Sequence, residues 1–438
     1  MSTTALVLKQ KLTEVIGDFI ELDTSTNLSS ASTAIIISSD LLQYDRGLDD
    51  YFNHWWAYIT EGLNAGVNRE VSDYTSTAYT LKLRGAALSS TSAAATFRLH
   101  RYNPAQQLRA LNNASREIYP NLFRSLDDHT LITGNILPNS HFEDWAAATI
   151  PDFYTAPTGS VAAATTYIRG GAKSAYLTAG ATPDYFYITS NDYPRLLDLM
   201  GKTVDFRCWA YPVDTADDAT IQIYTIKADA TAQTLTSTTA NPKGAWTLLE
   251  INNEVINDDI VEIQFRFRVK TTTKHAYFDN ARVIGQNRYE YLLPQDFQDG
   301  DLKQVYVQTE GYSDDACDDL LPRSWERIYG FKVIDDGTDK FIRLPFLYTD
   351  NRQIRLIGIH PLETLTTDAS TVSIDGETPN LLIAYAAYLL FEMERGVVSS
   401  EDVSRYDRLL SQWWGKYKML LPHLKMASPR GTMKLPSY

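Results

Sequence analysis

The 438-residue chain is poor in cysteine, and it lacks long apolar runs. Its two cysteines, Cys208 and Cys317, are too few for a disulfide framework or a cysteine-based zinc site, so we expect free thiols in a reducing compartment. No run approaches the roughly 18 apolar residues of a membrane span. The first residues, Met1–Leu6, lack the basic and apolar regions of a signal peptide. The sequence therefore predicts a protein assembled in the cytoplasm, with no membrane partner.

Basic charge is also scarce, since the net charge is −14 and the acidic excess is spread along the whole chain. Since no basic patch stands out, we expect no wrapping of nucleic acid around the outside of the protein. An acidic wall along which DNA slides without sequence-specific contacts remains compatible with this charge.

Catalytic and cofactor motifs are missing as well. The seven histidines show no metal-ligand spacing, and the chain has no phosphate loop, dinucleotide-binding motif or nucleophile elbow. Adjacent acids such as Glu143-Asp144, Asp217-Asp218 and Asp258-Asp259 would point to opposite faces of a strand, unlike the facing carboxylates of a glycosidase. We expect no enzymatic activity and no required cofactor.

Aromatic residues, by contrast, are abundant at 12%, with 27 Tyr and 8 Trp. Flat rings supply contact area at low entropic cost, so this content suits extensive interfaces. Aromatic-rich β cores would explain the same composition, and the two interpretations stay open at this point.

The hydrophobic pattern predicts an α+β multidomain protein. Residues 1–130 alternate between helical spacing (5–19 and 104–123) and a hairpin pattern (67–88). Residues 288–438 begin with short strands and end in two helices, one opened by Thr378-Pro379, which should form an αα-hairpin. The tail from Met426 to Tyr438 is polar and is expected to be ordered only by a partner.

Between these segments, residues 131–287 alternate apolar and polar positions in short runs separated by turns. Examples are Tyr185-Phe-Tyr-Ile-Thr189 and Val261-Glu-Ile-Gln-Phe-Arg-Phe-Arg-Val269. Regular short strands of this kind predict an inserted antiparallel β-sandwich of the jelly-roll type.

Two short motifs frame this segment: Asn139-Ser-His-Phe-Glu-Asp-Trp145 and Tyr277-Phe-Asp-Asn-Ala-Arg-Val283. If the first and last strands pair, Glu143 and Asp279 come close enough to hold a structural calcium ion; otherwise Glu143 is exposed and Asp279 belongs to a turn. Sugar recognition needs exposed rings, for which Trp209, Tyr211 and Trp246 are the candidates, with Tyr187 and Tyr224 also available.

With these motifs, residues 135–283 resemble the jelly rolls of carbohydrate-binding modules. In such modules the Glu after the Phe and the Asp of the last strand contribute to a structural calcium site. The resemblance therefore implies the same role for Glu143 and Asp279, and a host surface glycan as a partner.

The flanks resemble head-to-tail adaptors from the neck of tailed bacteriophages. The residues behind this are Asp49–Ile59, Asn64–Tyr74, Leu111-Asn-Asn-Ala-Ser-Arg-Glu-Ile-Tyr-Pro120 and the C-terminal helix pair. The resemblance implies a virion structural protein that forms a ring of about twelve copies. Its partners would be the portal protein, tail or nozzle proteins and the DNA that passes through the channel.

Within this interpretation, the end of the chain docks onto the portal or a neighbouring subunit, through Pro422, His423, Leu424, Met426 and Tyr438. The sandwich would face outward from the ring. The alternative is a tail-fibre, collar or decoration protein whose main role is host-glycan binding, and the third hypothesis is a glycan-active enzyme.

Overall fold

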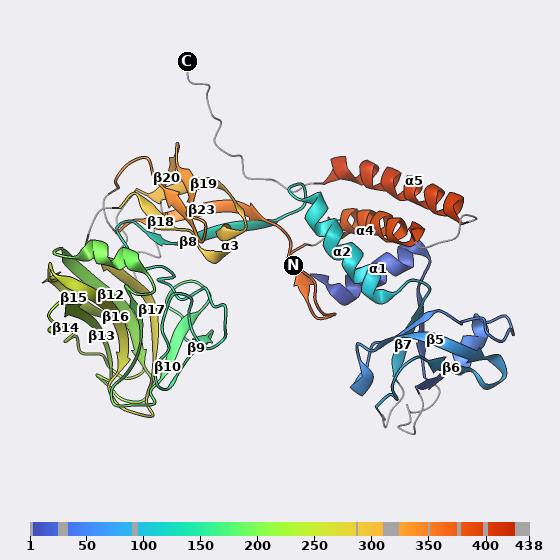
Figure 1. The fold of residues 1–438 in the computed structure, drawn as a ribbon, viewed down its shortest axis with the longest axis horizontal. Helices are drawn as coiled ribbons and strands as arrows, with labels where there is room; N and C mark the ends of the chain where they lie inside the picture. The colour runs from blue at the N-terminus through green and yellow to red at the C-terminus, as the bar shows by residue number, and fades with distance from the viewer. Residues whose placement is uncertain are drawn as a thin grey trace, which may run out of the picture. The chain divides into compact units, whose positions relative to one another are not determined.

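The computed structural model describes residues 3–24, 34–89, 95–285, 288–309, 324–348, 351–374, 378–396 and 402–424. The chain is predominantly β, with several antiparallel sheets and a few helices (Figure 1). It divides into two compact units: one contains residues 1–124 and 361–427, and the other contains residues 125–360.

The first unit combines a six-stranded sheet with a helical bundle. The sheet has the order β2-β7-β4-β5-β6-β3. Its strands are β2 (Ile20–Asp23), β3 (Ile35–Ile37), β4 (Trp56–Ile59), β5 (Asn68–Thr75), β6 (Thr80–Leu83) and β7 (Thr96–His100). The predicted hairpin is formed by β5 and β6, which pair antiparallel. Short 3-10 helices lie at η1 (Ser39–Gln43), η2 (Gly62–Asn64) and η3 (Ser76–Ala78).

The helical bundle unites the two ends of the chain. Helices α1 (Ala5–Ile16) and α2 (Pro104–Ile118) share one apolar core with α4 (Thr378–Arg395) and α5 (Val403–Leu420). Figure 1 shows the blue α1 in the same group as the red α5. Strands β1 (Thr3–Thr4) and β24 (Thr371–Val372) pair beside it, and η6 (Leu421–His423) follows α5.

The helix boundaries follow from capping. The Oγ of Thr4 accepts a hydrogen bond from the N–H of Val7, which fixes the start of α1. The helix ends at Ile16, earlier than the predicted residue 19, because Gly17 adopts φ 73° and its N–H bonds back to Glu14. The predicted αα-hairpin is confirmed, since α4 and α5 pack against each other.

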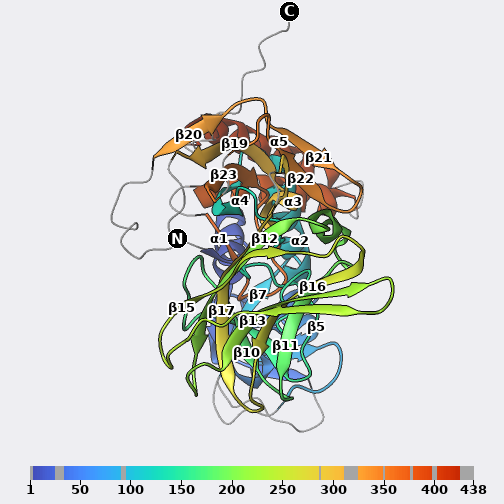
Figure 2. The same cartoon turned by 90° about the vertical axis from the view of Figure 1, so that its left-hand side faces the viewer.

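The second unit contains the predicted sandwich, and that prediction is confirmed. One sheet has the order β15-β12-β17-β10-β9, and the other has the order β11-β16-β13-β14. The strands are β9 (Ser160–Ala164), β10 (Ser174–Thr178), β11 (Asp184–Thr189), β12 (Thr203–Pro212), β13 (Ala219–Lys227), β14 (Ala232–Thr236), β15 (Thr247–Val255), β16 (Ile260–Val269) and β17 (His275–Ile284), with η4 at Pro194–Leu199. Figure 2 shows these strands in green to yellow.

Aromatic side chains fill the space between the two sheets. Phe206 and Phe278 of the five-stranded sheet pack with Phe186, Phe265 and Phe267 of the four-stranded sheet. Cys208 is buried in the same core, whereas Cys317 lies outside the described residues. Part of the high aromatic content is thus used in a β core.

The sandwich interrupts a smaller β module. Strand β8 (Arg124–Ile132) precedes the sandwich in sequence but joins β19 (Asp301–Gln308), β20 (Trp325–Ile328) and β23 (Gln353–His360), which follow it, in one sheet. A second sheet contains β18 (Glu290–Leu292), β21 (Lys332–Asp335) and β22 (Lys340–Arg343), and α3 spans Gln295–Gln298. Both sheets contribute to one apolar core.

The chain is therefore nested: the sandwich is inserted into the small β module, and that module is inserted between α2 and α4. This division differs from the consecutive segments 1–130, 131–287 and 288–438 expected from the sequence. The physical reason is that the C-terminal helices bury their apolar faces against α1 and α2 rather than against the preceding strands.

Candidate functional site

The outward face of the four-stranded sheet carries three tyrosines around one arginine. On β11 and β16, Phe186 and Phe267 point to the core, so Tyr185, Tyr187, Gln264 and Arg266 occupy the opposite face. On β13, Gln222 and Tyr224 share that face, and the strand register places Arg266 opposite both Tyr187 and Gln222. We call these six residues the tyrosine–arginine face.

The guanidinium of Arg266 is held by these neighbours. Its central carbon lies 3.8 Å from the ring centroid of Tyr224 and 4.5 Å from that of Tyr185. Its Nε donates to Oε1 of Gln264 at 2.8 Å, and its NH1 donates to Oε1 of Gln222 at 3.0 Å. Burial lowers the pKa of Arg266 from its ordinary value. The guanidinium nevertheless stays charged, because arginine is not deprotonated in proteins at ordinary pH.

The hydrogen bonds continue to both edges of the sheet. The Nε2 of Gln264 donates to Glu262 at 2.6 Å, and the same carboxylate accepts from the hydroxyl of Thr189 at 2.9 Å. On the other side, Nε2 of Gln222 donates to the hydroxyl of Thr236 at 3.0 Å. The polar side chains between the tyrosines are thus fixed in position before any ligand arrives.

The predicted sugar-binding aromatics lie on the other sheet, on the far side of the sandwich. Trp209 and Tyr211 lie on β12, and Trp246 comes directly before β15. The structure brings these residues together: the rings of Tyr211 and Trp246 are edge-on at 5.6 Å. The ring faces have partners from the loop before β10, since Arg169 lies 4.3 Å from the Trp209 centroid and Tyr167 stacks on Tyr211 at 4.4 Å.

The two predicted calcium ligands hold that same loop. The start of the segment meets the last strand only at an isolated bridge, between Asn135 and Ile284 of β17, and the first strand of the sandwich, β9, pairs with β10 instead. Asp279 accepts hydrogen bonds from the N–H groups of Arg169 (2.7 Å) and Gly170 (3.0 Å). Glu143 accepts from those of Ala172 (2.7 Å) and Lys173 (3.1 Å). The alternative of an exposed Glu143 and a turn at Asp279 is therefore wrong.

These carboxylates bind amide donors, and they lie close enough to influence each other. Burial raises the pKa of Asp279 to about 7, and the charge of Glu143 adds to the rise. Within the described ranges, no group of three or more His, Cys, Asp or Glu side chains could hold a metal ion. Since calcium takes six to eight oxygen ligands, two carboxylates already bound to N–H groups fit such an ion poorly. The calcium site stays a prediction.

A cleft of about 550 Å³ lies beside Glu143. Its lining includes Asp128 of β8, Asp144 of the sandwich and Asp296 of α3. Burial raises the pKa of Asp144 to about 6, and the nearby charges of Asp128, Asp152 and Asp296 add to the rise. The cleft is therefore a region of crowded negative charge.

The predicted docking residues are only partly within the described structure. Pro422 and His423 belong to η6, and Leu424 packs against the helical core of its own chain. Met426 and Tyr438 lie outside the described residues. None of the helices in the described ranges combines the length and apolarity needed to cross a membrane.

The sequence indicates Tyr187 and Tyr224 as available aromatics, but none of its motifs indicates Tyr185, Gln222, Gln264 or Arg266. The alternation in Tyr185-Phe-Tyr187 and Gln264-Phe-Arg266 was the signal that could have identified them, because polar residues between buried phenylalanines must share one outward face. Which outward faces would be neighbours depends on strand pairing, which the sequence does not state.

No protein-family model matches this chain, and no curated protein matches it. Among solved structures, it is similar to a xylan-binding domain of carbohydrate-binding module family 22, with 14% identity over 35% of this chain and 95% of that one (TM-score 0.30). The family 22 xylan-binding domain of Paenibacillus barcinonensis Xyn10C is also similar, with 13% identity over 37% and 96% of the two chains (TM-score 0.29).

A third similar structure comes from a phage. It is the enzymatically active domain of tailspike protein 4 of bacteriophage CBA120, with 12% identity over 35% of this chain and 22% of that one (TM-score 0.27). The similar structures thus include carbohydrate-binding modules and a phage tailspike domain.

Proposed function

We propose that this protein binds glycans, and that the tyrosine–arginine face of its sandwich binds a linear polysaccharide. The observation that carries the proposal is the position of Arg266, clamped between Tyr185 and Tyr224 and hydrogen-bonded to Gln222 and Gln264. Sugar rings present apolar faces that stack on aromatic rings, and hydroxyl groups that bind amide and guanidinium groups. The tyrosine–arginine face offers both kinds of group on adjacent strands.

Three features make this face better suited to a sugar than the aromatics of the five-stranded sheet. Its polar groups are fixed by neighbours, so little side-chain entropy is lost when a ligand binds. Its residues lie on paired strands rather than on loops. On the other sheet, the groups that cover ring faces of Trp209 and Tyr211 come from the loop before β10, whereas Arg266, which covers Tyr185 and Tyr224, lies on a paired strand of the same sheet.

Isothermal titration of the full chain with soluble polysaccharides, among them xylan, tests this proposal. A few stacked rings and hydrogen bonds at about 1 kcal/mol each give dissociation constants between roughly 10 μM and 1 mM. We expect Tyr187→Ala to weaken binding about tenfold without changing the melting temperature, because its ring contacts only Tyr185 among the aromatic pairs described.

Trp246→Ala is the matched control, because it removes a half-buried aromatic from the opposite sheet. We expect it to leave the affinity unchanged. Loss of binding in Trp246→Ala together with normal binding in Tyr187→Ala would move the site to the other sheet. No binding of any polysaccharide by the unaltered chain would overturn the proposal.

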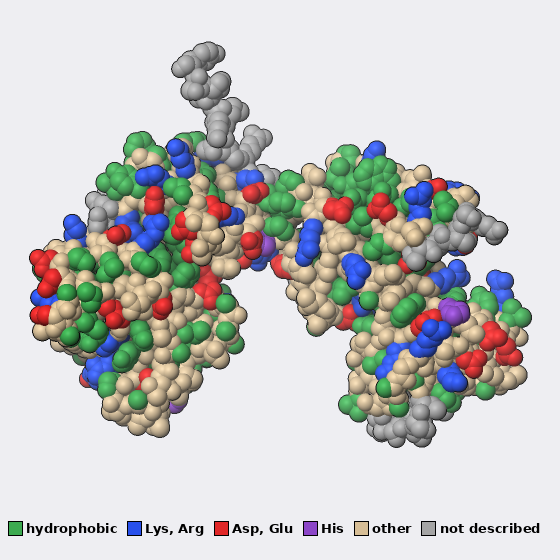
Figure 3. Space-filling model, in the orientation of Figure 1, with side chains coloured by type: hydrophobic (Ala, Val, Ile, Leu, Met, Phe, Trp, Pro, Cys, Tyr) green, Lys and Arg blue, Asp and Glu red, His purple; other side chains and the backbone are tan. Residues whose placement is uncertain are grey.

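A second candidate function is that of a head-to-tail adaptor in a phage virion, in which the sandwich would face outward. The observation that favours it is the aromatic surface of the helix pair, where Tyr385, Tyr388 and Trp414 form a continuous cluster. Trp414 is 37% exposed and Met419 is 62% exposed, and Figure 3 shows hydrophobic side chains gathered over this part of the molecule. Such a patch suits an interface between subunits.

Native mass spectrometry distinguishes the two candidates. A ring of about twelve copies, formed alone or with portal protein, is expected for the adaptor. A protein that stays monomeric or trimeric in both conditions, and binds polysaccharide, would leave glycan attachment as its main role.

A further inference from the structure

The acidic cleft takes no part in the proposed glycan binding. Acids from three separate segments line it: β8, the loop that precedes β9 in the sandwich, and α3. They are Asp127, Asp128, Glu143, Asp144, Asp152 and Asp296. Lys173 is the lysine of this lining, and Asp127 is paired with Arg355, which lies outside it. The remaining acids outnumber Lys173, so the cleft has a net negative charge that favours a cationic ligand.

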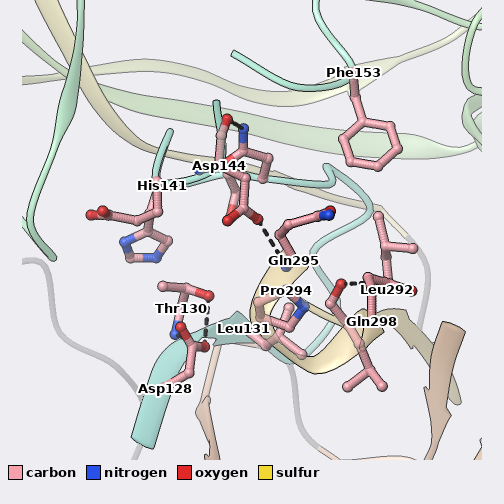
Figure 4. A pocket seen from close by; sticks show the side chains of 14 residues that line it. Asp128, Thr130, Leu131, His141, Asp144, Phe153, Leu292, Pro294, Gln295 and Gln298 are labelled. Atoms are coloured by element: carbon pink, nitrogen blue, oxygen red, sulfur yellow. Dashed lines mark hydrogen bonds between the residues drawn. The ribbon is translucent and has the colours of Figure 1, made fainter. Parts of the chain in front are cut away.

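A buried histidine adds a second, independent feature. His141 is 5% exposed and lines a separate pocket of about 40 Å³, which shares Asp128, Glu143 and Asp144 with the acidic cleft. Among the described residues, its buried Nε2 has no hydrogen-bond partner. Figure 4 shows the imidazole of His141 on the side of the pocket where Thr130 and Asp128 lie. An unpaired buried nitrogen costs free energy, which a ligand with a polar group would recover.

The chain itself contains a segment of complementary charge. Residues 425–438 include Lys425, Arg430 and Lys434 and no acidic residue, although the whole chain has a net charge of −14. Hydroxyl groups at Ser428 and Thr432 lie between these bases in the sequence. Lysine and arginine would pair with the carboxylates, and the neutral polar groups could bind His141.

We propose that the acidic cleft is a docking site for a basic peptide, and that its occupant is the segment 425–438 of this protein. Docking would neutralise part of the crowded charge of Asp144 and Asp296. It would also link the end of one chain to the junction between the sandwich and the small β module. The proposal is independent of glycan binding at the tyrosine–arginine face.

Fluorescence anisotropy with a labelled peptide of residues 425–438 tests this inference. The receptor is the chain truncated after Leu424, which keeps every described residue. We expect binding that weakens at least threefold when salt rises from about 50 to 300 mM, because ions screen exposed charges. The full-length chain should bind the labelled peptide more weakly than the truncated one, because its own segment competes.

Charge variants then locate the site. Asp296→Asn and Asp152→Asn should each weaken binding about threefold, since each removes one carboxylate from the lining. Asp259→Asn is the matched control, because it removes the same charge from a residue outside the cleft, where Asp259 pairs with Lys227. A peptide with glutamine at positions 425, 430 and 434 should not bind.

Two results would overturn the inference. One is the absence of binding by the truncated chain at a receptor concentration of about 100 μM, where even a weak docking contact would be detected. The other is an equal loss of affinity in Asp259→Asn and Asp296→Asn, which would show attraction to the overall negative charge rather than docking in the cleft.

Discussion

We predict that Asp184 stabilises the folded state at the start of β11, the strand that holds two tyrosines of the proposed binding face. Its buried carboxylate precedes Tyr185 and accepts hydrogen bonds from four backbone N–H groups. The donors are Thr158 (2.9 Å), Gly159 (2.7 Å), Gly180 (2.7 Å) and Tyr185 (2.9 Å). Burial alone would raise the pKa of Asp184, but these hydrogen bonds outweigh burial and lower it.

Replacing Asp184 with alanine removes all four acceptor contacts. A buried donor left without a partner costs about 1 kcal/mol or more, so we expect Asp184→Ala to lower the free energy of unfolding by about 4 kcal/mol. For a unit of this size, that corresponds to a fall of roughly 10 °C in melting temperature. The backbone around Asp184 is already closely packed, since a Cβ on Gly159 would lie 2.1 Å from the carbonyl oxygen of Thr178.

Differential scanning calorimetry of the full chain measures this effect, with two controls. Asp184→Asn keeps one acceptor oxygen, so its loss should be about half as large. Asp229→Ala removes an exposed carboxylate that accepts hydrogen bonds from the N–H and hydroxyl of Thr231, and it should leave the transition nearly unchanged. Because the folded-state pKa of Asp184 is lowered, its stabilisation is present above pH 3.8 and is lost as the pH falls through the folded value. If the Asp184→Ala variant has the same melting temperature as the unaltered chain at pH 7, the reasoning is refuted.

Two further predictions concern the buried acids Asp279 and Asp18. Asp279→Ala should lower the melting temperature by the equivalent of about 3 kcal/mol, in chelator as in calcium, because three N–H groups lose their acceptor. A loss seen only in calcium would instead show that Asp279 holds a cation. In the first unit, burial raises the pKa of Asp18 to about 7 and lowers that of His100 to about 4. Asp18 therefore reduces stability as the pH rises from 4 to 7, and His100 reduces it as the pH falls from 6.5 to 4. Urea titrations at pH 4.5 and 7 should show that Asp18→Asn loses more stability on acidification than the unaltered chain; an identical dependence would contradict this sign.

Much of the secondary structure could be predicted from local patterns. The 3.6-residue spacing of Leu8 and Leu12 predicted α1, and Thr378-Pro379 predicted the start of α4, because capping and amphipathicity are local properties. The period-2 alternation around Phe265 and Phe267 predicted the sandwich strands for the same reason. The end of α1 was missed because the left-handed conformation of Gly17 overrode the apolar pattern that continues to Phe19.

The candidate sites were less predictable. Trp209 and Tyr211 were chosen because tryptophan and tyrosine commonly bind sugars, but the sequence could not indicate that Arg169 and Tyr167 would cover their rings. Arg266 carries no motif of its own. Its role depends on Tyr185 and Tyr224, which both precede it in the sequence, by about 80 and about 40 residues, and come into contact with it only through strand pairing.

The sequence by itself determined that the chain has too few cysteines for a disulfide framework. It also determined the helices at both ends and the presence of an inserted β-sandwich, because each of these depends on residue content or local periodicity. Only the tertiary structure decided that the terminal helices share one core, that Glu143 and Asp279 hold the same loop, and that six acids from three segments line one cleft. These features depend on contacts between residues far apart in the chain. Such contacts are selected by the burial of whole helix and sheet faces, and no short stretch of sequence specifies them.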